Sequence, residues 1–288
     1  LGYGTVGQGV AKIIQDKKNL LKEFTGYDFE IKKVLVNNLD KEREVKLPEQ
    51  LFTTNADEIL NDSDIDIVIE VISAIEPAKD MILKAMENGK SVVSANKAVI
   101  SKYFEEFNEV AEKNNVHFLY EASVAGGIPV IKPLHDIVMQ NEINRVRGIL
   151  NGTCNYILSK MSENNQGYNE VLKEAQKLGY AEADPSSDVN GDDTLRKLRI
   201  LSTIAFKQQV REENIILDGI SNIKAEDIEN LAKFNKTIKL IGDAWIENNE
   251  IMAVVQPVAI DKGTYFASVN DAYNSVTING DIVGELKF

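Results

Sequence analysis

The stretch LGYGTVGQGVAKIIQ, residues 1–15, reads as the tail of a strand, a glycine turn and the start of a helix. Gly2, Gly4 and Gly7 form the pattern G-x-G-x-x-G, which is weak alone but meets its required context between a strand and a helix. The first glycine permits a tight turn, the second lets a pyrophosphate approach the backbone, and the third lets helix and strand pack closely. The stretch therefore predicts a dinucleotide site at the helix N-terminus, where free amides face the phosphates.

The cofactor contacts expected from this turn lie on the glycine loop and at the end of the following strand. They are Gly2, Gly4, Thr5, Val6, Gly7 and Asn37. An NAD site usually has Asp or Glu at that strand end, about 20 residues beyond the glycines. Here the strand ends in Val36-Asn37-Asn38, and Lys41 and Arg43 follow at a spacing that suits a 2′-phosphate. This favours NADP, with NAD as the alternative, although both charges are equally compatible with a solvated loop.

Outward from the turn, strand-like and helix-like segments alternate. The strand-like segments are 29–38, 64–72, 91–97 and 116–124, and helix-like segments occupy 77–90 and 101–115. Residues 64–72, DIDIVIEVI, are nearly continuously apolar, as in a strand buried on both faces. This alternation predicts an α/β fold with a Rossmann-type doubly wound parallel sheet.

The pattern changes after AGGIPVI, residues 125–131. Helical segments follow, and strand-like segments at 251–260 and 274–288 stand close together near the end. We expect a second, α+β domain on an antiparallel or mixed sheet. The boundary is placed at Gly127, with a dinucleotide-binding domain over 1–127 and a substrate-binding and dimerisation domain over 128–288.

Composition excludes several classes of partner. The net charge of −13 over 288 residues argues against nucleic acids and anionic membranes, because nothing would neutralise phosphates. No apolar run approaches the ~20 residues of a membrane span. The single cysteine, Cys154, rules out an internal disulfide and predicts a cytoplasmic protein. Because the first residue is Leu1 and not Met, we expect the natural N-terminus to lie upstream.

An acidic stretch, GYAEADPSSDVNGDDTLRKL at residues 179–198, raises a question of chemistry. A calcium loop starting at Asp188 would need Gly at position 6 and Glu at position 12, where Asp193 and Arg199 stand, so that interpretation fails. Asp193 and Lys197 are spaced i, i+4 and share one face of a helix. Taken alone, this spacing favours a surface ion pair worth only ~0.3–0.5 kcal/mol.

Several stretches together resemble homoserine dehydrogenase. They are GYGTVGQGV (2–10), SANKA (94–98), YEASVAGGIPVI (120–131), GILNGTCNYIL (148–158) and the acidic stretch at 179–198. The resemblance covers nearly the whole chain and implies an NAD(P)-dependent enzyme. Its members interconvert L-homoserine and L-aspartate 4-semialdehyde on the route to threonine, methionine and isoleucine.

The resemblance also assigns roles to residues. It implies that Lys197 is the proton donor, that Asp193 faces the substrate with it, and that Glu182 binds the substrate ammonium. Lys97 would contact the nicotinamide side of the cofactor and the substrate. The resemblance further implies a homodimer through the second domain's sheet and a sodium site. The sodium ligands would be the Glu121 carboxylate and the carbonyls of Val124, Gly126 and Ile128.

The sequence departs from the family pattern at two places, and two alternative functions stay open. Cys154 stands where the family more often has threonine, but neither histidine lies in a motif that would activate it, so we expect a packed residue. The chain ends at Phe288 without the helix that returns to the nucleotide domain in the family. The rivals are another Rossmann oxidoreductase of amino acids or polyols, and a non-catalytic NADPH-binding sensor.

Overall fold

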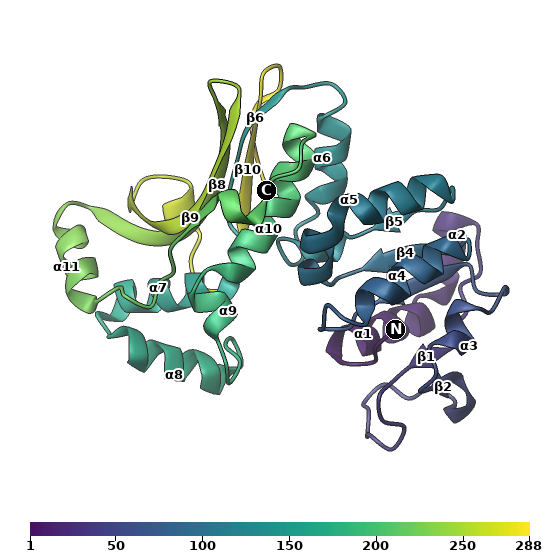
Figure 1. The fold of residues 1–288 in the computed structure, drawn as a ribbon. Helices are drawn as coiled ribbons and strands as arrows, with labels where there is room; N and C mark the ends of the chain where they lie inside the picture. The colour runs from purple at the N-terminus through teal and green to yellow at the C-terminus, as the bar shows by residue number, and fades with distance from the viewer. The chain divides into compact units, whose positions relative to one another are not determined.

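The computed structural model describes residues 1–288, which divide into two compact units, Leu1–Tyr120 and Glu121–Phe288 (Figure 1). The division falls a few residues before Gly127, where the sequence placed the boundary. The reason is local. The Glu121 carboxylate accepts the backbone N–H groups of Val130 and Ile131 at 2.7 and 2.8 Å, which ties the intervening residues to the second unit.

The first unit contains a parallel sheet that the chain's first residues hold together. Its strands are β1 (Val34–Leu35), β2 (Phe52–Thr53), β3 (Ile67–Glu70), β4 (Ser91–Ser94) and β5 (Phe118–Leu119). β1 pairs with β2, and β3, β4 and β5 pair in that order. Gly2 N–H donates to the Leu35 carbonyl at 3.1 Å, and Val71 N–H donates to the Leu1 carbonyl at 2.9 Å. Residues 1–2 thus lie between β1 and β3, which gives the doubly wound strand order and confirms the predicted fold.

Helices of the first unit pack on this sheet. They are α1 (Thr5–Asp16), α2 (Lys18–Thr25), α3 (Asp57–Leu60), α4 (Ala78–Glu87) and α5 (Lys97–Lys113), with a 3-10 turn η1 (Glu49–Leu51). The inward faces of α4 and α5 bury Ile82, Met86, Ile100 and Phe107 completely. Phe107 meets Phe118 of β5 edge to face, with ring centroids 5.2 Å apart. This packing fixes the β4–α5 connection, where Lys97 stands.

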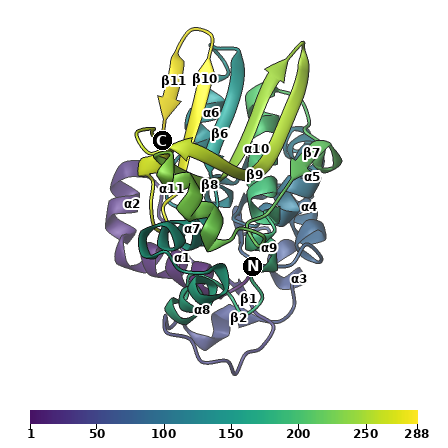
Figure 2. The same ribbon diagram turned by 90° about the vertical axis from the view of Figure 1, so that its left-hand side faces the viewer.

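The second unit is built on a six-stranded sheet with the order β11-β10-β6-β8-β9-β7 (Figure 2). Its strands are β6 (Ile143–Ile149), β7 (Ile215–Leu217), β8 (Lys236–Glu247), β9 (Glu250–Asp261), β10 (Ser275–Gly280) and β11 (Gly284–Lys287). All pairs are antiparallel except β7 with β9. Asn248 and Asn249 join β8 to β9 with φ of 52° and 65°, the conformation that tight two-residue hairpins require. The expected mixed sheet of an α+β domain is confirmed.

One long buried helix of this unit, α10, carries the candidate site. The helices are α6 (Ile131–Ile137), α7 (Gly152–Asn164), α8 (Tyr168–Leu178), α9 (Ser186–Val189), α10 (Asp192–Phe206) and α11 (Ala225–Lys233), with 3-10 turns η2 (Glu121–Ser123), η3 (Glu212–Asn214) and η4 (Phe266–Ser268). α10 lies on one face of the sheet against β6 and β8 (Figure 1). Gly242 of β8 allows this close approach, since a Cβ there would lie 3.2 Å from the Thr194 methyl group. None of the helices combines the length and apolar character that a bilayer span demands.

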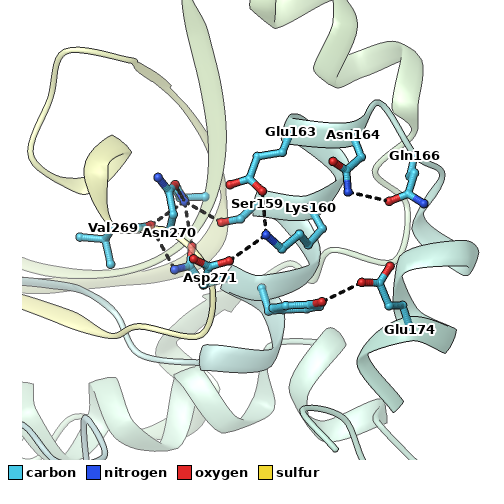
Figure 3. A network of polar contacts seen from close by, with 12 residues as sticks. Ser159, Lys160, Glu163, Asn164, Gln166, Glu174, Val269, Asn270 and Asp271 are labelled. Atoms are coloured by element: carbon cyan, nitrogen blue, oxygen red, sulfur yellow. Dashed lines mark hydrogen bonds and ion pairs between the residues drawn. The ribbon is translucent and has the colours of Figure 1, made fainter. Parts of the chain in front are cut away.

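A buried lysine fastens α7 to the loop that precedes β10. Lys239 of β8 is 1% exposed, and its ammonium donates to the Asn155 and Asn270 side-chain oxygens at 3.0 and 3.1 Å. It also donates to the Val269 carbonyl at 2.6 Å and to the Ser159 hydroxyl at 3.2 Å. Figure 3 shows Ser159, Val269 and Asn270 beside the surface pairs of Lys160 with Glu163 and Asp271. Burial lowers the pKa of Lys239 to about 8.

A Lys239→Met variant should have a free energy of unfolding ~1–3 kcal/mol below that of the unsubstituted protein, because it leaves buried oxygens without a hydrogen-bond donor. The stability gap should also widen with pH. Between about 8 and the ordinary lysine value of 10.5, the unfolded chain keeps a proton that folded Lys239 has released, so wild-type stability rises there. Urea unfolding at pH 7, 8.5 and 9.5 measures both effects. A stability difference between the two proteins that stays constant over this pH range would contradict the lowered pKa of Lys239.

Candidate functional site

The glycine turn of the first unit has the geometry expected of a dinucleotide loop. Gly2 has φ +95°, and a Cβ there would lie 3.0 Å from the Val71 carbonyl oxygen. A Cβ on Gly7 would lie 2.4 Å from the Gly2 carbonyl oxygen, whereas a Cβ on Gly4 would meet nothing within 4 Å. Gly2 and Gly7 are therefore needed to close the turn, while Gly4 faces open space.

The start of α1 suits a bound phosphate. Gly4 precedes the helix without any side-chain cap, and Gly4, Thr5 and Val6 are exposed. The first amides of a helix have no intrahelical acceptor, and the helix dipole favours negative charge at that end. Exposed uncapped amides beside open space fit the pyrophosphate of a dinucleotide.

In the loop after β1, which lies beside the turn, Arg43 contacts its own loop. Its guanidinium donates to the carbonyls of Asn38 and Lys41 at 2.6 and 2.7 Å and lies over the Phe52 ring. Arg43 therefore organises its own loop. Asn37 and Lys41 are exposed beside it.

Lys97 is the first residue of α5, at the carboxyl end of β4, where open α/β sheets bind ligands. A buried network that the sequence analysis missed holds this end of the sheet. Glu70 of β3 accepts the Ser94 hydroxyl at 2.6 Å and the Ile72 N–H at 2.7 Å, and burial raises its pKa. Asn96 caps α5 and donates to the Ala74 carbonyl at 2.9 Å. A glutamate at the end of an apolar strand was the only signal for this network.

In the second unit, Asp193 and Lys197 form a buried ion pair on the first turns of α10. The Lys197 ammonium lies 2.7 Å from Asp193 Oδ2 and donates to the Leu150 carbonyl at 2.8 Å. The two side chains are only 2% and 15% exposed, Asp193 and Lys197 respectively. The alternative of a solvated surface pair is therefore wrong. The reason is that α10 packs on the sheet with its first turn at the end of β6.

Asn151, which is not among the site residues predicted from the sequence, connects this pair to its surroundings. Its Nδ2 donates to Asp188 Oδ1 at 2.7 Å and to Asp193 Oδ2 at 2.8 Å. Its Oδ1 accepts the Cys154 N–H at 2.7 Å and caps α7. The signal available was an Asn directly before a helix start, which is common at helix caps in general.

Cys154 is a packed residue, as expected. It is fully buried, and its thiol donates to the Asp188 carbonyl at 3.1 Å. Burial, and then the neighbouring Asp188 and Asp193 carboxylates, raise the pKa of the thiol well above its ordinary value. Since the thiolate is the nucleophile, this environment does not favour thioester chemistry.

Glu182 lies in the exposed loop between α8 and α9. The loop is held through its backbone, because Gln176 donates to the Glu182 carbonyl at 3.1 Å and Thr153 donates to the Tyr180 carbonyl at 2.7 Å. The carboxylate of Glu182 is not brought into contact with Asp193 or Lys197. The structure thus joins two of the three substrate residues expected in this unit and leaves the third exposed.

The expected cation loop is a turn in which Ala125 and Gly126 have φ of 58° and 60°. The Glu121 carboxylate is engaged as a cap, since besides Val130 and Ile131 it accepts the Lys132 N–H at 2.8 Å. The carbonyls of Val124, Gly126 and Ile128 accept no hydrogen bond from the backbone.

A cavity of about 680 Å³ in the first unit runs between residues 27–34 and 64–69, at the amino ends of β1 and β3. It is lined largely by apolar side chains, and Gly2, Gly7 and Val71 also line it. Dinucleotides bind at the carboxyl ends of such strands, so most of this cavity lies away from the expected cofactor site.

A glycine turn on a doubly wound sheet, in one chain with a domain that holds a lysine–carboxylate pair, is typical of Rossmann-fold dehydrogenases. Residues 2–121 match the family model described as "Homoserine dehydrogenase, NAD binding domain", and residues 129–288 match the model described as "Homoserine dehydrogenase". The chain belongs to the homoserine dehydrogenase family.

Individual relatives agree with this assignment. The chain is 43% identical over 288 residues to the homoserine dehydrogenase of Bacillus subtilis, covering 100% of this chain and 66% of that protein. The structure of a homoserine dehydrogenase from Thiobacillus denitrificans superimposes with a TM-score of 0.93 at 39% identity, covering 99% of this chain and 66% of that one. A hyperthermophilic archaeal homoserine dehydrogenase mutant in complex with NADPH gives 0.76 at 25% identity, with 99% and 88% covered. The chain thus spans about two thirds of the length of the first two relatives.

Proposed function

We propose that the protein is an NADP-preferring homoserine dehydrogenase that interconverts L-homoserine and L-aspartate 4-semialdehyde by hydride transfer. The observation that carries the proposal is the buried Asp193–Lys197 pair. A lysine held at a fixed point by a buried carboxylate and a backbone carbonyl suits a proton donor better than a stability device, because burying an ion pair brings little net stability.

The geometry around Lys197 supports its role as proton donor. An ammonium has three N–H donors, and in Lys197 two of them are directed to Asp193 and to the Leu150 carbonyl. The third is left for the substrate's aldehyde oxygen. A bound nicotinamide supplies the hydride in reduction and accepts it in oxidation. As negative charge develops on the aldehyde oxygen, Lys197 stabilises it and delivers the proton.

The site residues other than Lys197 are proposed to bind the substrate or the cofactor. Glu182, exposed within the acidic stretch at 179–198, is proposed to bind the substrate ammonium, as an amino-acid substrate requires. Asp193 faces the substrate with Lys197. Lys97, at the carboxyl end of β4, is proposed to contact the cofactor and the substrate.

The cofactor preference rests on the loop after β1. The strand end offers Asn37 where an NAD site usually has a carboxylate, and exposed Lys41 is available to a 2′-phosphate. The archaeal relative bound to NADPH agrees with this preference. Gly2, Gly4, Thr5, Val6 and Gly7 would hold the pyrophosphate, as the geometry of the turn favours.

A sodium ion, a homodimer and a cytoplasmic location complete the proposal. The carbonyls of Val124, Gly126 and Ile128 lack backbone donors, and hard oxygen ligands suit such an ion. Glu121 offers one less-used oxygen, because Oε1 accepts two of its three amides. The dimer is proposed through the second unit's sheet.

Homoserine-dependent reduction of NADP and of NAD by the purified protein tests the function. We expect turnover with both cofactors and a higher kcat/KM with NADP. Polyols should not be oxidised, because they lack the ammonium that Glu182 would bind. NADPH binding without any turnover of homoserine would support the sensor instead.

A further inference from the structure

We propose that Asn151 is a positioning residue that holds Asp193, and through it Lys197, in the geometry for proton transfer. This inference rests on the proposed function, since it gives the proton donor of that reaction its place. Asn151 is not proposed to contact the substrate or the Lys197 ammonium, and it acts through the Asp193 carboxylate.

The contacts of Asn151 show how it would do so. Asp193 Oδ2 receives two donors, Asn151 Nδ2 at 2.8 Å and the Lys197 ammonium at 2.7 Å. Both donors meet the same oxygen, so a rotation that moves Oδ2 breaks both contacts. Leu150, the neighbour of Asn151, accepts from Lys197 through its carbonyl at 2.8 Å. Two adjacent residues after β6 thus set the positions of both members of the ion pair.

The Asn151 side-chain amide also separates two negative charges. Asp188 and Asp193 come from α9 and α10, and the Asn151 NH₂ group lies between them, within 2.8 Å of an oxygen of each. Asp193 is 1% exposed, so little water screens the two negative charges. Without a donor between them, like charges at this distance favour protonation of one carboxylate. The amide donates to both carboxylates and so offsets their repulsion.

The segment that carries Asn151 is rigid enough for positioning. Its neighbour Gly152 lies so close to the loop before β10 that a Cβ would come within 2.7 Å of the Ala272 carbonyl oxygen. Asn155, one turn later in α7, donates to the carbonyls of Val269 and Tyr273 at 3.1 and 3.0 Å. The start of α7 is therefore tied to the loop before β10.

A purely structural role for Asn151, as the cap of α7, can be separated from positioning. The cap uses Oδ1, and positioning uses Nδ2. Serine is a favourable N-cap but its single hydroxyl cannot donate to two carboxylates. An Asn151→Ser variant therefore keeps the cap and removes the bridge, and Asp188→Asn removes one of the two charges that the bridge separates.

The kinetic test compares Asn151→Ser, Asp188→Asn and the double variant in homoserine oxidation. We expect Asn151→Ser to lower kcat by about 10²-fold, as loss of alignment does, with KM for NADP within about twofold of wild type. The acid limb of its pH–rate profile should move to higher pH. The double variant should recover at least tenfold of the loss and return the acid limb, because one charge is gone. A kcat within threefold of wild type, or no rescue by Asp188→Asn, would overturn the proposal.

A second readout needs no turnover, so it separates this inference from the proposed function. Proton–nitrogen NMR spectra of lysine ammonium groups detect those held by persistent hydrogen bonds, and a Lys197→Arg variant assigns the signal. We expect the Lys197 signal in wild type, its loss in Asn151→Ser, and an unchanged Lys239 signal as internal control. A protein that shows this pattern but does not oxidise homoserine would refute the function and keep the positioning. A Lys197 signal that survives in Asn151→Ser would refute the positioning whatever the activity.

Discussion

A Lys197→Met variant should oxidise homoserine about 10³-fold more slowly than the unsubstituted protein while it binds NADPH with unchanged affinity. Methionine fills the volume of the lysine stem but can neither donate to the aldehyde oxygen nor neutralise its developing charge. The expected pyrophosphate loop, Gly2–Gly7, belongs to the first unit, whereas Lys197 belongs to the second. Steady-state kinetics and NADPH fluorescence titration measure the two effects separately.

Two further variants make this result specific. Lys236→Met removes a lysine from an exposed pair, in which the ammonium lies 2.8 Å from Asp261, and should leave the rate within twofold. Lys197→Arg keeps the charge near Asp193, so it guards against a Met variant that fails to fold. It should be slow because the guanidinium stays protonated and cannot take the proton that homoserine releases on oxidation. A Lys197→Met enzyme that keeps more than a tenth of the wild-type rate would remove Lys197 from the role of proton donor.

The fold was predictable because its signals are local. A glycine turn such as Gly2–Gly7 and a nearly continuous apolar run at 64–72, which contains β3, each indicate their structure within a few residues. The doubly wound order follows once such units repeat. The first and last residues of each strand were harder to predict from the sequence. The strand β1 covers only Val34–Leu35. The sheet continues beside it through residues 1–2, which are joined to Leu35 and to Val71 by single backbone hydrogen bonds.

The candidate site was only partly predictable, because its members meet through tertiary contacts. The i, i+4 spacing of Asp193 and Lys197 predicts a shared helix face but says nothing about burial, which depends on how α10 packs against β6 and β8. Asn151 lies 42 residues before Asp193 in the chain, and no periodicity links the two. Glu70 and Ser94 likewise meet across neighbouring strands. Such pairs become visible only when the sheet register is known.

Arg43 makes local contacts that spacing along the sequence does not predict. A basic residue shortly after the second strand suits a 2′-phosphate, yet the Arg43 guanidinium is directed to carbonyls of its own loop at 2.6 and 2.7 Å. Side-chain direction in a loop depends on which backbone acceptors the turn presents. That information is absent from spacing alone.

Replacing Gly7 by Ala should destabilise the first unit by at least ~1–3 kcal/mol and weaken NADPH binding more than tenfold. The added Cβ would lie 2.4 Å from the Gly2 carbonyl oxygen, which belongs to backbone and cannot move aside as a side-chain tip could. α1 must therefore shift away from the sheet. The amides at its first turn, which would hold the pyrophosphate, shift with it. Thermal unfolding and NADPH titration follow the two consequences.

Gly9 in the same helix provides the matched control, because a Cβ there would meet nothing within 4 Å. Gly9→Ala should stabilise the protein by about 0.5–1 kcal/mol, since alanine loses less backbone entropy in a helix, and should leave NADPH binding unchanged. Opposite signs of the stability change at positions 7 and 9 would show that contact with the turn, and not helix propensity, makes glycine necessary at Gly7. Equal and small effects at both positions would mean that the turn can relax around a methyl group. The third glycine of the pattern would then have no part in holding α1 against the sheet.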